Sequence, residues 1–374
     1  MKIVHTFINN MGIDTNNPDK ITFADRWGLT SLKKLGHKIT LICGSKTPRR
    51  KEYFWKGIKV IELPTSFELT DSSRITNGLI KELIKIKADI FHTHHYGSFI
   101  PEITVIIGKI KKIPTFLTIH TDFGERKGIM GILLKTYSVV MQPFLGLYSK
   151  IFFISKYIKN KTEFKLLKQE KKILLYNQFV KPPVIRIKKT ENSILFIGRI
   201  AHVKGIDILI KIMAIIKKEI PNIKLNIVGG GLESYKKILN KIIIKKKVKK
   251  NIKFYGKLYG KEKWKQFYSN TILIIPSRKE GFGNVAIEGM LCKIPVVVSN
   301  NGALPEAVNK YGIIINIKDI PGSAKKIINL LKNKNLRKNL PEKAKKYAEK
   351  FTEEKLGKIL IEEYKKAIKN GKRI

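Results

Sequence analysis

Two cations five residues apart have the spacing to hold a diphosphate in the second half of the chain. The run Ser193–Ile197 is short and rich in β-branched residues, as strands are, and Gly198-Arg199 follows it. Lys204 then precedes an apolar helical pattern that begins near Asp207. A guanidinium grips a diphosphate through two parallel hydrogen bonds, and a lysine ammonium adds a compact charge to the same group. A solvated basic turn is the alternative in a chain this rich in lysine.

A run of three glycines gives a second candidate contact to phosphate. Gly229, Gly230 and Gly231 lie between the strand-like run Ile223–Val228 and a helical segment. Glycine lets a ligand approach the backbone closely, and amides at the start of a helix bind phosphate. A simple tight turn explains the same residues, so the run predicts a ligand contact only together with its neighbours.

The segment from Pro276 to Glu288 carries the strongest pattern. Glu280 lies on a loop that follows a strand-like run, whereas Glu288 lies about one turn inside a helix that is expected to begin near Asn284. We therefore expect both carboxylates to face one pocket at the strand end. Carboxylates there accept hydrogen bonds from sugar hydroxyls, while the amides at the helix start face phosphate. The alternative, a capped helix with two solvent-facing acids, gives no reason for the two glycines of the loop.

An alternation of strand-like and helical patterns positions these segments and runs through the whole chain. Such alternation is typical of a parallel sheet covered by helices on both faces. Strands are expected at 39–42, 59–62, 90–92, 115–119, 193–197, 223–228, 252–255, 272–275 and 295–298, and helical patterns include 25–35 and 77–86. Ligands of such sheets bind beyond the carboxyl ends of the strands, where the three segments above lie.

A linker at 177–192, with two adjacent prolines and several charges, interrupts this alternation. The sequence therefore predicts an α/β chain of two doubly wound, Rossmann-like domains, at 1–180 and 190–350. The charged segment at the end of the chain carries one apolar stripe, which favours a helix over about 350–374 that packs back on the first domain.

Composition sets the broad class of protein. Of the 374 residues 43% are hydrophobic, enough for each half to bury a core and too many for a disordered chain. Cys43 and Cys292 offer neither a disulfide framework nor a metal-ligand spacing, as expected in a reducing cytoplasm. Neither a signal peptide nor an apolar run long enough to cross a bilayer is visible. We therefore expect a cytoplasmic protein, soluble or peripheral on the inner face of the cell membrane.

Lysine and arginine outnumber the acidic residues 75 to 29, which gives a formal charge of +46. A field this positive attracts phosphate in nucleic acids, anionic lipids or nucleotides. The lysines are scattered through nearly every helix alongside many isoleucines, so a biased coding composition explains the charge equally well. The basic run 245–250 contains no aromatic residue on which a base could stack, and no nucleic acid partner is expected.

The combined motifs resemble the retaining GT-B glycosyltransferases of the GT4 group, also called glycosyl transferases group 1. The resemblance is carried by Gly-Arg followed by Lys-Gly, by two glutamates separated by seven residues, and by the later loop Asn300–Glu306. It extends over essentially the whole chain. It implies two Rossmann-like domains that face each other across a cleft, the first on the acceptor side and the second binding a nucleoside-diphosphate sugar.

The resemblance also implies a role for individual residues. Arg199 and Lys204 neutralise the departing diphosphate in place of a divalent metal, and no Asp-x-Asp triplet stands beside a strand end, so neither a metal nor a cofactor is expected. Glu280 holds hydroxyls of the transferred sugar, and Glu288 takes the ribose hydroxyls. The implied catalytic residues are His120, Arg199, Lys204 and Glu280. The implied donor-binding residues are Gly198, Arg199, Lys204, Gly230, Glu280, Gly281, Phe282, Gly283, Asn284, Val285 and Glu288.

Histidines end two strand-like runs in the first half. His120 follows one of them, and the resemblance implies that it reaches the donor sugar; a hydrogen-bonded core histidine is the alternative. His92, His94 and His95 follow the other run and invite a zinc interpretation. A zinc site needs further ligands, so a structural or acceptor-side role is favoured for them.

Two stretches depart from the family pattern. The family usually has a loop with paired glycines near the N-terminus, and here the corresponding stretch Asn17–Thr22 contains none. Asn177-Gln178 stands where Asn-Gly is common before the linker. Without those glycines, the usual reason to expect the backbone of this loop to lie close to the donor or the acceptor is missing. Neither departure affects the segments expected to bind the diphosphate.

The acceptor, on this interpretation, is a glycan, a lipid-linked molecule or a small molecule with a free hydroxyl. The basic and apolar stretch 128–154 predicts either a helix on an anionic membrane surface, near a lipid-linked acceptor, or an ordinary core helix. Two other functions stay open. One is a GT-B nucleotide-sugar epimerase, which the glutamate spacing fits less well, and the other is a basic nucleic-acid-binding protein.

Overall fold

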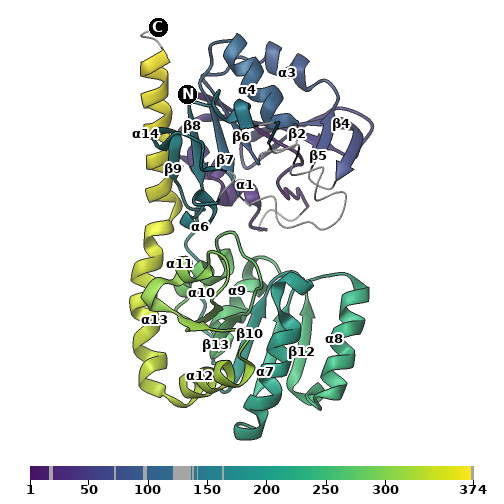
Figure 1. Cartoon of the computed structure of the whole chain (residues 1–374), viewed down its shortest axis with the longest axis vertical. Helices are drawn as coiled ribbons and strands as arrows, with labels where there is room; N and C mark the ends of the chain where they lie inside the picture. Colours follow the sequence, from purple (N-terminus) through teal and green to yellow (C-terminus); the bar gives the residue numbers. More distant parts are fainter. Residues whose placement is uncertain are drawn as a thin grey trace. The chain divides into compact units, whose positions relative to one another are not determined.

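The structure, a computed structural model, describes residues 1–16, 20–70, 73–95, 99–120, 136, 139–140, 142–161 and 164–371 (Figure 1). The chain divides into two compact units, an N-terminal unit of residues 1–178 and 353–374 and a C-terminal unit of residues 179–352. Each unit is of the α/β type and is built around a mainly parallel sheet.

The sheet of the N-terminal unit has the strand order β3-β4-β2-β1-β6-β7-β8-β9, with β5 paired to β4. Among the described strands, β3 and β5 are the two that pair antiparallel. The strands are β1 (Lys2–Phe7), β2 (Lys38–Ser45), β3 (Lys51–Trp55), β4 (Ile58–Thr70), β5 (Ser73–Thr76), β6 (Ile90–His94), β7 (Thr115–Ile119), β8 (Lys150–Phe153) and β9 (Lys172–Leu174). The chain passes from β1 outward through β2 and later resumes on the other side of β1 with β6, so the strand order reverses between β1 and β6.

Side chains alternate between the two faces of this sheet, as strand geometry requires. On β1, the Thr6 hydroxyl hydrogen-bonds the Thr104 hydroxyl of α4 (Ile100–Ile110) at 3.0 Å, whereas His5 lies on the opposite face. His92 and His94 are two residues apart on β6, and both stack against His5 on that opposite face. The sheet therefore presents a threonine face to α4 and a histidine face to the other layer.

The helix expected over 25–35 is instead two short helices, α1 (Phe23–Arg26) and α2 (Leu29–Lys34). Gly28 separates them with a φ of 92°, a left-handed conformation that does not occur inside a helix. The side-chain amide of Gln178 lies 2.6 Å from the position that a Cβ on Gly28 would take. The interruption is thus fixed by a residue distant in sequence. The helix expected over 77–86 is present as α3 (Leu79–Lys85), and α6 (Lys156–Lys159) follows β8.

The helix α14 (Glu353–Gly371), yellow in Figure 1, belongs to the N-terminal unit. It packs against α2. Leu356, Leu360 and Tyr364 recur every four residues and are buried, whereas Ile359 of the expected stripe is 42% exposed. The Tyr364 hydroxyl hydrogen-bonds Nδ1 of His92, so α14 is joined directly to the histidine face of the sheet.

The C-terminal unit contains a six-stranded sheet in the order β12-β11-β10-β13-β14-β15, and all its pairings are parallel. Its strands are β10 (Ser193–Ile197), β11 (Lys224–Val228), β12 (Ile252–Gly256), β13 (Ile272–Ile275), β14 (Val296–Ser299) and β15 (Ile313–Ile315). The chain runs outward from β10 through β11 to β12 and then returns to β13, so the order reverses between β10 and β13. The predicted strand positions in this unit are confirmed to within one residue.

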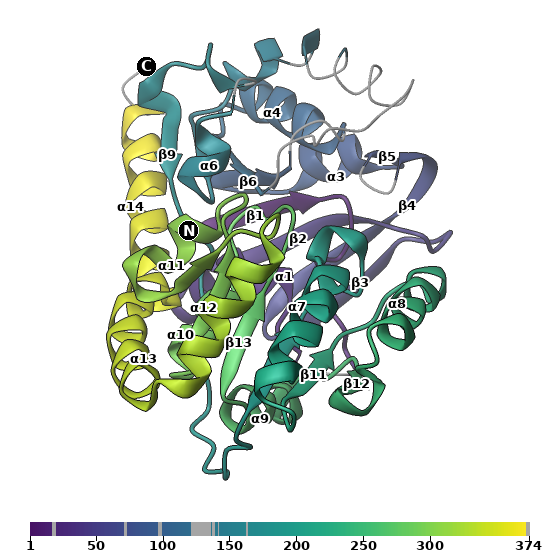
Figure 2. The same ribbon diagram turned by 60° about the horizontal axis from the view of Figure 1, so that its bottom comes forward.

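Helices cover both faces of this second sheet. The helices of the unit are α7 (Ile206–Glu219), α8 (Glu233–Lys245), α9 (Gly260–Ser269), α10 (Asn284–Leu291), α11 (Leu304–Val308), α12 (Ile320–Lys332) and α13 (Lys334–Ala348). On one face α7 packs beside α12 and shares an aliphatic core with α8 (Figure 2). Gly289 of α10 lies against Leu273 and Val296, which face the other side. The loops at the carboxyl ends of the strands are therefore held on a rigid two-sided framework.

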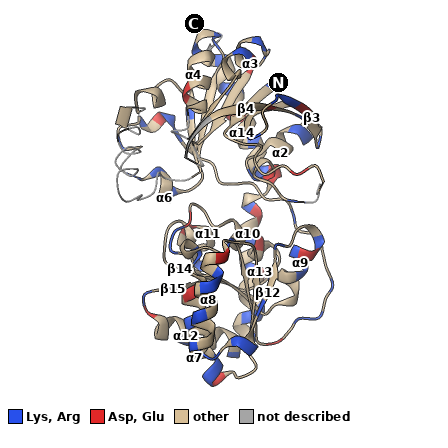
Figure 3. Cartoon of the chain, turned by 90° about the vertical axis from the view of Figure 1, so that its right-hand side faces the viewer, with Lys and Arg blue, Asp and Glu red and all other residues tan. Residues whose placement is uncertain are grey.

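Positive charge is spread widely over the surface. Figure 3 shows lysine and arginine along helices of both units, including α7, α8 and α12, so the charge is not confined to one element. Within the described part of the chain, no helix combines the length and apolar character needed to cross a membrane.

The core of the N-terminal unit contains four buried histidines, His5, His92, His94 and His120. Burial lowers the pKa of His5 to about 3, and it lowers the pKa of each of the other three well below the usual 6.5. Neighbouring imidazoles lower the pKa values of those three further. All four imidazoles are therefore neutral at neutral pH.

Removing the contact between α14 and the sheet should destabilise the N-terminal unit. We expect Tyr364→Ala to lower the free energy of unfolding by about 3–5 kcal/mol, because it empties a fully buried aromatic site. Tyr364→Phe should cost about 1–3 kcal/mol, because Nδ1 of His92 loses its partner. Urea denaturation, followed by tryptophan fluorescence in a Trp264→Phe background that leaves Trp27 and Trp55, measures both. Ile359→Ala, an exposed change on the same helix, should stay within about 0.5 kcal/mol, and an equal loss there would contradict this account.

The buried histidines should also make the stability of this unit depend on pH. Between pH 6.5 and the lowered pKa values, the unfolded chain binds protons that the folded chain does not, so the free energy of unfolding falls as the pH falls. Each histidine contributes a slope of roughly 1.4 kcal/mol per pH unit. Urea midpoints measured from pH 7 to pH 5 should show this loss. A His92→Asn variant should lose stability less steeply, since it takes up one proton fewer, and an unchanged slope would argue against this origin.

Candidate functional site

In both sheets the candidate residues lie at the carboxyl ends of strands, at or next to the place where the strand order reverses. In open α/β sheets, ligands bind in the crevice at the carboxyl ends of the two strands that flank such a reversal. In the C-terminal unit these strands are β10 and β13, and the loops that follow them begin with Gly198 and Pro276. In the N-terminal unit they are β1 and β6, and β6 ends at His94.

The loops that follow β10 and β11 continue the pairing of their strands. The amide of Gly198 donates to the carbonyl of Val228 at 3.0 Å, and the amide of Ile200 donates to the carbonyl of Gly230 at 2.8 Å. A Cβ on Gly229 would lie only 1.8 Å from the carbonyl oxygen of Gly198. The contact between the two loops thus requires glycine at position 229. It brings the segment that contains Arg199 and Lys204 next to the run of three glycines, as two of the predicted ligand-binding segments.

The loop that follows β13 is tied to the same place. A Cβ on Gly205 would lie 2.0 Å from the carbonyl oxygen of Pro276, and the amide of Arg278 donates to the carbonyl of Val203 at 2.8 Å. The Arg278 guanidinium also binds both carboxylate oxygens of Asp207 in the first turn of α7, at 2.8 and 2.6 Å. Arg278 therefore fixes the loop of the third predicted segment against the loop of the first.

The backbone of Glu280 is held by a fourth loop, the one that follows β14. The amide of Ala303 donates to the carbonyl of Glu280 at 3.0 Å. A Cβ on Gly302 would lie 2.4 Å from that same oxygen, and Gly302 has a φ of 63°, so only glycine suits the position. Upstream, the Ser299 hydroxyl donates to the carbonyl of Ser277 at 2.5 Å.

Lys204 and Glu280 form an ion pair, with 2.5 Å between Nζ and one carboxylate oxygen. Both side chains are partly buried. Arg199 lies on the same loop as Lys204 and is exposed at the surface of the unit. The structure therefore brings Lys204 and Glu280 into contact and leaves the guanidinium of Arg199 accessible to a ligand.

Glu288 lies in a different environment from Glu280. It is 1% exposed, and the Nζ of Lys263 on α9 donates to both of its carboxylate oxygens, at 2.8 and 2.7 Å. The sequence predicted that both glutamates face one pocket. In the structure Glu280 pairs with Lys204 and Glu288 pairs with Lys263, so each carboxylate has a lysine partner from a different element.

The helix α10 begins directly after this loop. Gly283 is its N-cap, with a φ of 100°, and Asn284 and Val285 form its first turn, which carries the positive end of the helix dipole. Phe282 is buried against Phe179 and Phe351 in the same unit. Gly281 lies between this anchored phenylalanine and Glu280, so the backbone from Glu280 to Val285 is well fixed.

In the N-terminal unit, His120 follows β7 and is stacked under an indole. The ring centroids of His120 and Trp27 are 3.7 Å apart, and Trp27 also stacks on His94 at 4.9 Å. His95 lies next to His120 with a φ of 62°, a strained conformation for a residue other than glycine, and burial lowers its pKa to about 4. Aromatic rings thus enclose His120 at the carboxyl ends of β6 and β7.

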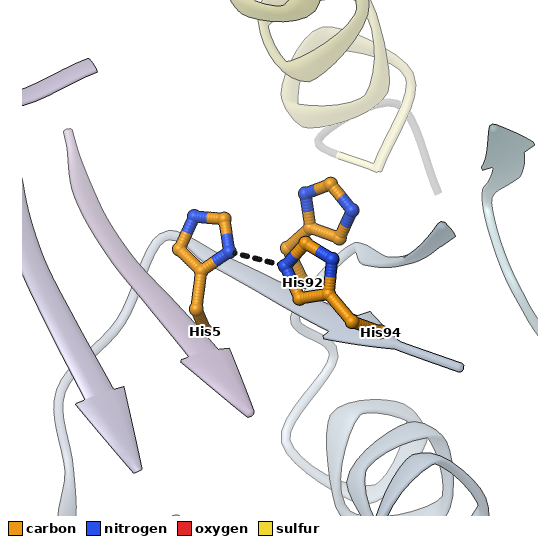
Figure 4. Close-up of side chains that lie close together, drawn as sticks. All are labelled: His5, His92 and His94. Atoms are coloured by element: carbon orange, nitrogen blue, oxygen red, sulfur yellow. Dashed lines mark hydrogen bonds between the residues drawn. The ribbon is translucent and has the colours of Figure 1, made fainter. Parts of the chain in front are cut away.

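The sequence suggested a zinc interpretation for His92, His94 and His95, whereas the structure gathers a different set of three, His5, His92 and His94. Ligand nitrogens of His5, His92 and His94 lie within 4.8 Å of one another. The rings are stacked, however, with an angle of 11° between the planes of His92 and His94 (Figure 4). Both nitrogens of His92 have partners, the hydroxyls of Tyr364 and Thr118. Nδ1 of His5 and Nε2 of His94 are also hydrogen-bonded to each other at 2.9 Å. The nitrogens are thus engaged with protein partners instead of converging on one ion, and the arrangement does not fit zinc.

Several contacts at the site were not predicted from the sequence. Lys263 and Arg278 are two of 75 basic residues, and no local signal separates them from the rest. Trp27 and His5 are brought to His120 by the order of the strands and by the interruption at Gly28.

Two predicted segments lie partly outside the described residues. They are residues 17–19 of the stretch that lacks the family's paired glycines, and most of residues 128–141 in the predicted membrane or core helix. Gln178, the other departure, accepts a hydrogen bond from the Ser31 hydroxyl at 2.6 Å.

Comparisons with known proteins give the family of the chain. The family profile described as Glycosyl transferases group 1 matches residues 177–347, and the profile described as Glycosyltransferase Family 4 matches residues 29–177. An uncharacterized glycosyltransferase of Methanocaldococcus jannaschii is 32% identical over 314 residues, which are 82% of this chain and 84% of that protein.

Solved structures show the same fold. Sucrose-phosphate synthase from Thermosynechococcus elongatus has a TM-score of 0.73 at 17% identity, over 98% of this chain and 99% of that one. Anabaena HepE, solved with UDP and glucose, has a TM-score of 0.72 at 16% identity, over 97% and 99% of the two chains. Taken with the two profiles and the archaeal relative, the strand-end motifs identify this chain as a member of the GT4-type glycosyltransferases, with the GT-B fold.

Proposed function

We propose that this glycosyltransferase uses a nucleoside-diphosphate sugar as donor and transfers the sugar to an acceptor hydroxyl with retention of the anomeric configuration. One observation carries the proposal. The loops that bear Arg199, Lys204 and Glu280 meet at the strand-order reversal of the C-terminal unit, through contacts that only glycine permits. A cationic pair and a carboxylate on a rigid loop cluster match a ligand that has a diphosphate next to a polyol.

Lys204 and Arg199 neutralise the diphosphate as it leaves. The Lys204–Glu280 ion pair holds the ammonium in place before the donor arrives. The exposed Arg199 guanidinium adds two parallel donors, and the amides at the start of α10 add the positive end of a helix dipole. Fixed charges of this kind stabilise the transition state without a reorganisation cost. They supply what a divalent ion would otherwise supply, so the proposed reaction is independent of metal.

The two glutamates divide the sugar recognition. Glu280 accepts hydrogen bonds from hydroxyls of the transferred sugar with the carboxylate oxygen that Lys204 leaves available. Glu288 accepts from the ribose hydroxyls, and the two hydrogen bonds from Lys263 orient its buried carboxylate. Because Lys263 donates to both oxygens of this carboxylate, the two ribose hydroxyls must either add their hydrogen bonds to those of the lysine or displace the lysine. Lys263 is thus part of the proposed ribose site.

Retention of configuration follows if the acceptor attacks on the face that the diphosphate leaves. A phosphate oxygen of the leaving group then takes the acceptor proton, and no protein nucleophile is needed. The role proposed for His120 is a hydrogen bond to the donor sugar, as the family resemblance implies. With its pKa lowered by burial, His120 does this as a neutral imidazole.

The acceptor is proposed only by class, as a glycan, a lipid-linked molecule or a small molecule. HepE was solved with UDP and glucose, and that supports a nucleotide donor without naming the base here. The relatives support neither the epimerase nor the nucleic-acid-binding alternative. For a lipid-linked acceptor, the formal charge of +46, with lysine and arginine along many helices (Figure 3), suits peripheral attachment to an anionic membrane on the cytoplasmic side.

Removing a diphosphate contact should abolish most of the turnover and leave the fold intact. We expect Arg199→Ala and Lys204→Ala each to lower kcat by roughly 10²–10³-fold, the usual cost of losing one group that stabilises transition-state charge. Lys224→Ala removes an exposed cation at the amino end of β11 and should keep wild-type activity. Turnover and the melting temperature of all three variants test this. Near-normal kcat in both site variants contradicts the assignment.

A donor panel should identify the base. Among UDP-, GDP- and ADP-sugars, we expect one base to raise the melting temperature most, because a ligand at 100 times its Kd stabilises the folded state by about 2.7 kcal/mol. The shift should persist in EDTA, since no metal is required, and should shrink in Arg199→Ala. Loss of the shift in EDTA contradicts metal independence. Salt-sensitive stabilisation by DNA, without a shift from any sugar nucleotide, contradicts the donor assignment itself.

A further inference from the structure

Three buried imidazoles form a continuous hydrogen-bonded chain in the N-terminal unit. Nδ1 of His5 lies 2.9 Å from Nε2 of His94, the bond drawn in Figure 4, and Nδ1 of His94 lies 3.0 Å from Nε2 of His120. The three residues come from the ends of β1, β6 and β7, so the chain crosses the sheet at its strand-order reversal. All three rings are buried.

A chain of this kind has only two arrangements. A neutral imidazole carries one N–H and one lone pair, and burial keeps these three rings neutral. Each contact joins an Nδ1 to an Nε2, so either all three rings carry the proton on Nδ1 or all three carry it on Nε2. If the three rings carried the proton on different nitrogens, two N–H groups or two lone pairs would face each other at hydrogen-bond distance. Buried polar groups would then be left without hydrogen bonds.

The two ends of the chain have no partner. Nε2 of His5 and Nδ1 of His120 are buried and lack a hydrogen bond among the described residues. In one arrangement His120 presents an N–H on Nδ1, and in the other it presents a lone pair. Trp27 lies flat against His120, so the ring cannot turn to exchange its nitrogens without losing that stacking.

We propose that His5 and His94 are positioning residues that fix the tautomer of His120. The three imidazoles share one tautomer, so Nδ1 of His120 donates a hydrogen bond when Nδ1 of His5 and of His94 carries the proton, and accepts one when Nε2 carries it. The ligand group that meets this nitrogen is a hydroxyl of the donor sugar, a point that rests on the proposed function. In serine proteases, an enzyme whose catalytic histidine is held in the wrong tautomer has a kcat that is lower by up to about 10⁴-fold.

His92 supplies an internal comparison. It is as buried as His94 and stacks on both His5 and His94. Its nitrogens pair with the hydroxyls of Thr118 and Tyr364 rather than with an imidazole, so it lies outside the chain. An effect that spreads through packing would involve His92, whereas an effect of the hydrogen bonds would not.

The tautomers are measured directly by ¹⁵N NMR of the full-length protein labelled at histidine. The chain has seven histidines, so single substitutions assign the signals. We expect the proton on the same ring nitrogen in His5, His94 and His120 at neutral pH. A mixture of tautomers among these three residues overturns the proposal. This measurement needs no substrate and stands even if the transferase reaction proposed above proves wrong.

Substitution of His5 tests the positioning role. His5→Leu leaves Nε2 of His94 without a partner, and we expect His120 then to populate both tautomers. His5→Asn puts an amide near the position of Nδ1 and should restore a single tautomer. His92→Asn, the matched control, should leave His120 unchanged. An unaltered His120 in His5→Leu, or an equal change in His92→Asn, overturns the positioning role.

Kinetics separate positioning from a loss of structure. In His5→Leu, kcat should fall roughly tenfold or more while KM for the donor changes by less than about twofold, because the tautomer matters most in the transition state. His5→Asn should recover most of the lost kcat. If kcat falls equally in both variants while the NMR signals of His120 stay single, tautomer control is excluded as the cause.

Discussion

Direct backbone contact between strand-end loops is the constraint on which the C-terminal unit depends. Gly229, Gly205 and Gly302 each allow a neighbouring carbonyl oxygen to lie where a Cβ would otherwise be. A side chain at any of the three would separate two loops and shift everything attached to them. Lys204 and Glu280 meet because their loops are joined in this way. The glycines thus act on the charges indirectly, by bringing together the backbone that carries them.

Acidic residues are scarce in this chain, with 29 carboxylates against 75 lysines and arginines. Three acidic residues at the site have cationic partners. Asp207 pairs with Arg278 and serves the architecture, while Glu280 pairs with Lys204 and Glu288 pairs with Lys263. A lysine ammonium is a point charge on a flexible stem, so a ligand can displace it or share it more readily than a bidentate arginine. The arginine–aspartate pair is therefore suited to holding the loops together, and the lysine–glutamate pairs are suited to binding a ligand that replaces or joins the lysine.

The sequence predicted the framework of the C-terminal unit well because its strands and loops carry local signals. Short β-branched runs located β10, β11, β13 and β14, with glycine after the first two and proline after β13. The spacing of Glu280 and Glu288 marked the segment Pro276–Glu288. The N-terminal unit was harder to predict. Gly28 interrupts an amphipathic pattern because Gln178, far along the chain, occupies the space beside it. Lys263 was not predictable, since only the packing of α9 against α10 distinguishes it from the other lysines.

The histidine cluster of the N-terminal unit is neutral, unlike the ion pairs at the site of the C-terminal unit. A protein with a formal charge of +46 would repel a further buried cation, and the histidine cluster avoids this by remaining unprotonated. Neutrality has a consequence for hydrogen bonding, because a neutral imidazole must be either donor or acceptor at each nitrogen. Isolated in water, the ring would exchange between the two forms; inside a chain of imidazoles it cannot do so alone. The same burial that removes the charge of His120 thus makes its neighbours responsible for the direction of its hydrogen bond.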